Sequence, residues 1–181
     1  MFAFLPSLVY FVMAPLSVSL ALWLAFAAAF AVGIHAFGAM RIVRIFDVCG
    51  LILFGALALY TGFVEADFGP ADAALVMEAG FLVAILWSMA ARQPFTMQYA
   101  WLKTELEPRA ALRAHTLLTA AWATAYAAMA AISALAVVLH RLAPGWSGVL
   151  GLLVFAATLA FTWRFGVYID KRGGNLPRLR R

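Results

Sequence analysis

Glu78 is the residue whose type and position most clearly suggest chemistry. It is an acid inside a long apolar stretch, six residues after Asp72, or about 9 Å further along a helix. An unpaired charge inside a membrane costs at least about 2.5 kcal/mol, so an intramembrane carboxylate suggests cation binding or proton relay. The alternatives are a protonated Glu78, one paired with Arg141, or one hydrogen-bonded to Tyr60 or Thr61 at the same depth.

Two histidines offer a second kind of chemistry. His35 and His115 fall near the same predicted membrane face, on different spans, and could meet as two axial haem ligands. The alternative is hydrogen bonding at the interface.

Cys49 is the single cysteine and suits a small buried apolar role. The sequence holds no zinc pattern, nucleophile elbow or glycine-rich phosphate loop, so we predict no metal site and do not favour an enzyme.

The composition predicts the medium in which these residues lie. Of 181 residues, 66% are hydrophobic and 12% are charged, with a mean hydropathy of +0.97. A soluble domain carries about 25% charged and 45–50% apolar residues, and one of this size cannot bury such an excess. The apolar residues form long runs rather than an alternating pattern, which indicates helices and not a barrel. We therefore predict an all-α, polytopic helical membrane protein with a single transmembrane domain over residues 1–181.

The scarce charges divide the chain into spans. Residues 1–40 carry no charge, and Pro15 divides them into a short segment and a full span. The short segment cannot cross unaided, so we expect it to be tilted or re-entrant, and the side of the N-terminus stays open. The predicted hydrophobic segments are 3–14 (short), 16–39, 48–64, 73–91, 114–139 and 149–168, followed by a basic tail over 170–181.

A more polar segment follows Pro94. Apolar residues recur there at helical spacing, which predicts an amphipathic helix over residues 94–107 lying in the membrane interface. The residues expected to contact the membrane are Phe95, Tyr99, Trp101, Leu102 and Leu106.

The basic residues predict an orientation. Twelve of the thirteen Lys and Arg residues fall on one side of the spans, with Arg141 as the exception, whereas the opposite loops hold acids. The positive-inside rule then places the C-terminus in the cytoplasm. Basic residues near an anionic leaflet bind its headgroups, so the net charge of +5 indicates lipid contact and not nucleic acid. The residues expected to do so are Arg41, Arg44, Arg92, Lys171, Arg172, Arg178, Arg180 and Arg181.

Small residues recur every four positions along two spans, a spacing that lets helices pack closely. The two stripes are Ser17, Ala21, Ala25, Ala29 and Gly33, and Ala123, Ala127 and Ala131. They predict helix contacts, either within the chain or with other membrane proteins or a second copy.

Several strings resemble the bacterial intracellular septation protein A (YciB-like) family. They are FLPSLVYF at 4–11, RQPF at 92–95, Trp122-Ala123, and LAFTWRFGVYI at 159–169. The sequence departs from the family pattern at 13–17, where charged residues are missing, and at His115 and Thr119, where the family has Trp and Asn. The resemblance implies the bacterial inner membrane, contacts with other membrane proteins, and no established catalytic residues.

Three functional hypotheses follow. The first is a non-enzymatic inner-membrane protein that acts in septation or cell-envelope organisation, or as an accessory subunit, through helix contacts. The second is a small transporter or channel that uses Glu78. The third is a haem or quinone redox protein that uses His35 and His115.

Overall fold

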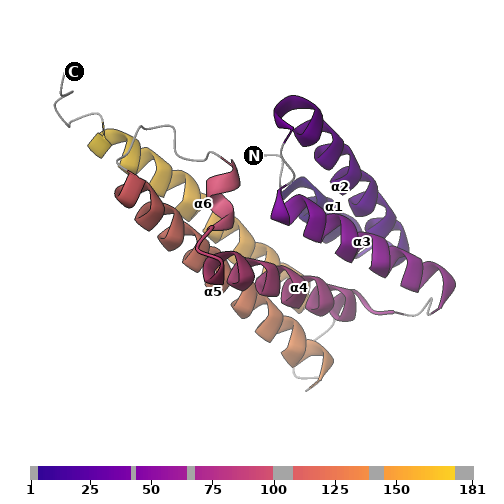
Figure 1. Cartoon of the computed structure of the whole chain (residues 1–181). Coiled ribbons are helices and arrows are strands. Elements are labelled where there is room, and N and C mark those ends of the chain that lie inside the picture. Colours follow the sequence, from indigo (N-terminus) through magenta and orange to yellow (C-terminus); the bar gives the residue numbers. More distant parts are fainter. Residues whose placement is uncertain (1–3, 42–43, 65–67, 100–107, 139–144, 174–181) are drawn as a thin grey trace, which may run out of the picture.

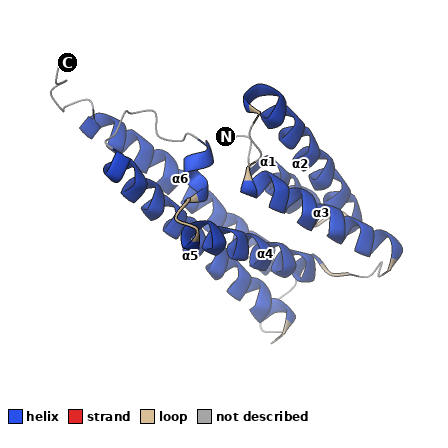
Figure 2. Cartoon of the chain, in the orientation of Figure 1, coloured by secondary structure: helices blue, strands red, loops and turns tan. Residues whose placement is uncertain are grey.

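The chain folds as a bundle of helices. The computed structural model describes residues 4–41, 44–64, 68–99, 108–138 and 145–173, which are almost entirely helical (Figure 1, Figure 2). The described elements are α1 (Leu5–Met13), α2 (Val18–Met40), α3 (Ile45–Phe63), α4 (Pro70–Ala90), the 3-10 helix η2 (Phe95–Tyr99), α5 (Pro108–Val137) and α6 (Trp146–Gly173). The five helices from α2 to α6 are each long and apolar enough to cross a membrane. The predicted polytopic helical membrane fold is confirmed.

Proline and serine set the local boundaries of these helices. Pro15 lies in the turn between α1 and α2, as predicted, and the Ser17 hydroxyl caps α2 by accepting a hydrogen bond from the Leu20 amide at 3.4 Å. Pro70 starts α4, where its missing N–H costs nothing. Helices α5 and α6 extend beyond the predicted spans 114–139 and 149–168 toward residues 108 and 173. A helix satisfies its own backbone hydrogen bonds and need not end where the apolar run ends.

The helices pack largely in chain order. Helix α2 lies against α1 and α3, while α5 lies between α4 and α6. Figure 1 shows α1, α2 and α3 grouped on one side and α4, α5 and α6 on the other. The contact of α3 with α4 joins the two groups.

One end of this bundle, which we call the basic end, is where α2, α4 and α6 finish and α3 and α5 begin. Every described Lys or Arg lies at this end or within about three helical turns of it. These residues are Arg41, Arg44, Arg92, Arg109, Arg113, Arg164, Lys171 and Arg172. Arg141, Arg178, Arg180 and Arg181 lie outside the described residues.

The short helix α1 packs one face into the bundle. Its residues Pro6, Ser7 and Tyr10 are buried, and Phe4, just before it, stacks on Trp122 of α5 with ring centroids 4.3 Å apart. Phe4 also meets Phe155 of α6 edge-on at 5.4 Å. The first segment is thus a half-length helix with one buried face, and its opposite face, with Leu5 and Val12, is exposed. This agrees with its predicted length.

Aromatic rings from several elements complete the core next to Phe4. Phe46 of α3 stacks on Phe81 of α4 and on Phe95 of η2, each with centroids 4.7 Å apart. Tyr126 of α5 lies 5.5 Å from Phe81. The rings of α1, α3, α4, α5 and η2 therefore form one continuous cluster.

The segment after Pro94 differs from the prediction. Residues 95–99 form a 3-10 helix and not the expected amphipathic α-helix, and the Phe95 side chain is fully buried instead of facing the interface. The Ser88 hydroxyl accepts a hydrogen bond from the Phe95 amide, and Thr96 bonds to α5, so the chain turns back into the bundle. Trp101, Leu102 and Leu106 lie outside the described residues.

The two small-residue stripes have different surroundings. Ala21, Ala25 and Ala29 are buried, so the stripe on α2 packs within the chain. On α5, Ala127 and Ala131 are exposed. The second stripe therefore leaves a small-residue surface on the outside of the bundle.

We expect Trp122→Ala to lower the free energy of unfolding by about 3–5 kcal/mol, because it leaves a cavity beneath Phe4. Trp163→Ala is the matched control, since Trp122 is 0% exposed and Trp163 is 61% exposed. Denaturant unfolding in detergent micelles, followed by circular dichroism, measures both. Equal losses in the two variants would show that the Phe4 stack does not support the bundle.

Candidate functional site

Glu78 belongs to the buried face of α4. Met77, Phe81, Ile85 and Ser88 line the same face at helical spacing, and all are buried. The period that places these residues in the core places Glu78 there too, where its side chain is 3% exposed. The carboxylate therefore faces the inside of the bundle and not lipid.

The two oxygens of Glu78 have different surroundings. Ser133 of α5 hydrogen-bonds to the carboxylate. A Cβ added to Gly151 of α6 would lie 3.8 Å from Oε1, so the backbone of α6 passes close to the carboxylate. Oε2 is buried and has no hydrogen-bond partner among the described residues. A buried acceptor without a partner costs about 1–3 kcal/mol, and more when it is charged.

Two tyrosines lie within electrostatic reach of this carboxylate. The charge of Glu78 acts on the phenol groups of both Tyr10 of α1 and Tyr126 of α5. The Tyr10 hydroxyl donates to the Pro70 carbonyl at 2.8 Å, at the end of the bundle opposite the basic end, and it also lies in the field of Asp72. Two helices thus each supply a phenol that the charge of Glu78 influences.

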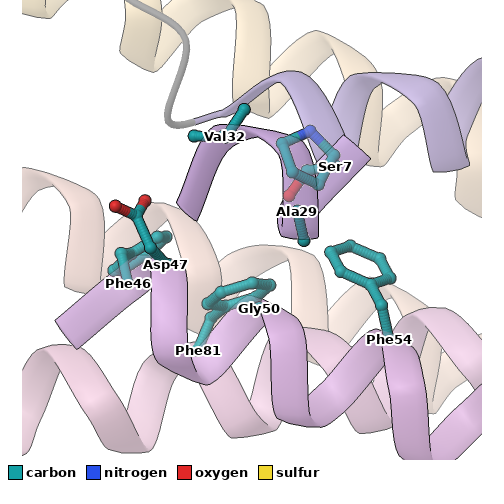
Figure 3. Close-up of a pocket in the computed structure, with 9 residues that line it drawn as sticks. Ser7, Ala29, Val32, Phe46, Asp47, Gly50, Phe54 and Phe81 are labelled. Carbon is teal, nitrogen blue, oxygen red and sulfur yellow. The ribbon is translucent and has the colours of Figure 1, made fainter. Parts of the chain in front are cut away.

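Further polar groups lie between Tyr126 and the basic end. The buried Tyr126 hydroxyl lies within reach of Ser7 but makes no well-aligned hydrogen bond among the described residues. Beside Ser7 is a space of about 10 Å³, close to the least that holds one water molecule. Figure 3 shows Ser7 and Ala29 on one side of this space and Phe81 on the other, with Asp47 at its edge.

Asp47 is the centre of a second polar group. Its Oδ1 accepts a hydrogen bond from the Tyr99 hydroxyl at 3.1 Å, and the Arg44 guanidinium lies 4.7 Å from the centre of the Tyr99 ring. Burial, followed by the charge of Asp47, raises the pKa of Tyr99 above its ordinary value of 10.0, so this phenol stays a hydrogen-bond donor. Gln98 fixes the start of α3 by accepting from the Ile45 amide at 2.9 Å.

The alternatives expected for Glu78 can be compared with these contacts. Thr61 donates to the Ala58 carbonyl of its own helix at 3.3 Å, and Tyr60 packs edge-on against Phe68. Arg141, the proposed ionic partner, lies outside the described residues. The observed hydroxyl partner is Ser133, on a helix that the sequence did not connect to Glu78.

The histidines occupy separate places. His35 is exposed on α2, whose main neighbours are α1 and α3. His115 is buried on α5, and its Nδ1 lies 3.2 Å from the Thr96 hydroxyl oxygen. This arrangement gives the two rings no shared site, so it does not support the haem hypothesis.

Cys49 is half-buried, and its thiol donates to the Gly80 carbonyl at 3.8 Å.

Sequence reasoning missed most of the groups around Glu78. Ser7, Tyr10, Tyr126 and Ser133 were not singled out, although Tyr126 and Ser133 are seven residues apart and so share one face of a helix. Trp122, four residues before Tyr126, lies on this face too. Because Trp122 is buried, the spacing predicts that Tyr126 and Ser133 also face the core. Nothing in the sequence places α1 against that face.

The fold and this site define a polytopic helical membrane protein with a carboxylate enclosed in its core. The chain matches no protein-family model, no curated protein and no solved structure. The resemblance to the septation protein A family therefore stays a prediction.

We expect Glu78→Met to raise the free energy of unfolding by about 1–3 kcal/mol, because it removes a buried acceptor that lacks a partner and keeps the side-chain volume. Denaturant unfolding in micelles measures the change. Asp72→Asn, on the first turn of the same helix, is expected to lower stability by about 0.5 kcal/mol by weakening a favourable interaction with the helix dipole. A clear loss of stability in Glu78→Met would instead assign Glu78 a structural role.

Proposed function

We propose that this protein conducts protons across the membrane and that Glu78 is the group that takes up and releases them. The observation that carries the proposal is the Glu78 carboxylate, buried in the bundle with Oε2 lacking a hydrogen-bond partner among the described residues. Ionisable residues in such positions mark ion and proton pathways, because they are costly to keep there.

The neighbouring groups extend a polar route on both sides of Glu78. Toward the end opposite the basic end lie Tyr10 and Asp72, and toward the basic end lie Tyr126 and Ser7. A hydroxyl can donate one hydrogen bond while it accepts another, so it can pass a proton along such a series. The water-sized space between Ser7 and Asp47 supports a continuation to the basic end.

A proton suits this site better than a metal ion. Divalent calcium takes six to eight oxygen ligands, and magnesium demands an octahedral set. The described groups at Glu78 are one carboxylate and a few hydroxyls, of which the Tyr10 hydroxyl already donates to Pro70. These groups fit a carboxyl that alternates between protonated and charged forms.

The short helix α1 supports this role because it supplies groups on both sides of Glu78. Ser7 and Tyr10 are one turn apart on its buried face. Half-length helices that end inside a bundle are a recurring device for placing polar groups at membrane depth in transport proteins.

The orientation and the cellular role are also proposals. The basic end supports a cytoplasmic C-terminus by the positive-inside rule, while a bacterial inner membrane rests on the family resemblance. A role in septation, in cell-envelope organisation or as an accessory subunit rests on the family resemblance alone.

Proton flux into liposomes tests the proposal. Purified protein is reconstituted with an entrapped pH-sensitive dye, and a potassium diffusion potential drives proton entry. We expect flux above that of empty liposomes for the natural protein and flux equal to empty liposomes for Glu78→Gln, which keeps the shape but cannot ionise. Unchanged flux in Glu78→Gln would refute the proposal.

Removing one hydroxyl should have a graded effect. Tyr126→Phe is expected to slow proton flux, because it removes the hydroxyl that lies near Ser7 and in the field of Glu78. Thr158→Ala is the matched control, since the Thr158 hydroxyl is also buried but returns to the Val154 carbonyl of its own helix at 2.8 Å. The same dye assay compares the two. Equal flux in both variants would exclude Tyr126 from the route.

A further inference from the structure

A groove runs between α2 and α3 on the outside of the bundle, away from Glu78. It has a volume of about 390 Å³ and apolar walls that include Phe30, Ile34 and Val48. Along α2 it extends from Ala29 to Gly38, a length of about 14 Å. This is close to half of the roughly 30 Å hydrocarbon thickness of a bilayer, so the groove is as long as one leaflet is deep.

Two glycines on α2 help to make the groove hollow. Gly33 and Gly38 both line it, and a Cβ added at either position would meet no atom within 4 Å. The flanking rings of Phe30 and Phe37 are more than half exposed, so the groove is open to the surroundings of the bundle. An elongated apolar group can therefore enter it without any movement of the helices.

The end of the groove nearest the basic end carries two opposite charges. Arg44 and Asp47 both line it. Arg44 is held against the Tyr99 ring, while Asp47 uses Oδ1 to accept from the Tyr99 hydroxyl. The second oxygen, Oδ2, is buried and has no hydrogen-bond partner among the described residues. This end therefore offers a fixed cation and a carboxylate oxygen that requires a donor.

We propose that this groove is a binding site for phosphatidylethanolamine from the leaflet at the basic end. One acyl chain lies along the glycine-lined hollow and the phosphate faces Arg44. The primary ammonium donates to Asp47 Oδ2, which is buried in the free protein, so the side chains that cover it move aside when the headgroup binds. A phosphate and a guanidinium form strong charge-assisted hydrogen bonds, as do an ammonium and a carboxylate. The zwitterionic headgroup matches the paired charges, whereas a purely anionic headgroup would place no cation against Asp47.

Phosphatidylcholine is the sharpest comparison. It has the same phosphate and the same net charge, but its quaternary ammonium has no N–H to donate. Because a hydrogen bond to a charged group contributes strongly, we expect phosphatidylethanolamine to be retained about tenfold better than phosphatidylcholine with identical acyl chains. Native mass spectrometry of the protein in mild detergent, titrated with each lipid, measures the retention.

Two variants locate the site. Gly33→Leu fills the groove and should abolish the retention of phosphatidylethanolamine, while Gly148→Leu should leave it unchanged, because a Cβ at Gly148 of α6 also meets nothing within 4 Å but lies outside the groove. Asp47→Asn should remove the preference over phosphatidylcholine. Circular dichroism before the titration confirms that each variant is folded.

Several outcomes would overturn the proposal. These are equal retention of the two zwitterionic lipids, stronger retention of phosphatidylglycerol, full retention in Gly33→Leu, or a protein dimer that Gly33→Leu dissolves and that retains no lipid. The proposal does not depend on proton conduction, since none of these measurements involves Glu78.

Discussion

Lipid tails are as apolar as leucine, so apolar helices gain little by leaving lipid for one another and depend instead on close contact between rings and small residues. In this bundle the central contact is the stack of Phe4 on Trp122. It anchors the start of α1 to α5, and the neighbouring stack of Phe46 with Phe81 and Phe95 joins α3, α4 and η2 to the same cluster. Tyr10, one and a half turns into α1, then reaches Pro70. Ser7 and Tyr10 are therefore positioned by the Phe4 stack before them and by the hydrogen bond of Tyr10 to Pro70.

The same packing explains why Glu78 is so unusual. The core around it is built from rings and small side chains that give a carboxylate little to bond with, and Ser133 supplies one partner. Its Oε2 has no partner among the described residues. A buried polar group that the surrounding core does not satisfy is typical of sites where function and stability conflict.

The helices could be predicted from the sequence because their causes are local. A charge such as Arg41 or Asp72 ends an apolar run whatever surrounds it, and Pro15 separates two helices by its own covalent geometry. The surroundings of Glu78 depend instead on which helices become neighbours. Ser133 lies 55 positions further along the chain, and no local pattern relates the two. The prediction for Phe95 is wrong for the same reason. Its spacing fits an interfacial helix, and only its stacking on Phe46 in the structure shows that its side chain turns into the core.

The packing of Phe4 has a consequence for how the protein is made. Helix α1 is synthesised before α5 and α6, yet two of the rings that hold Phe4 belong to those helices. Until α5 and α6 have inserted, the first segment packs only on α2, α3 and α4, and it is too short to cross the bilayer alone. The stack of Phe4 on Trp122 therefore forms only after α5 has entered the membrane, although Phe4 itself is made long before.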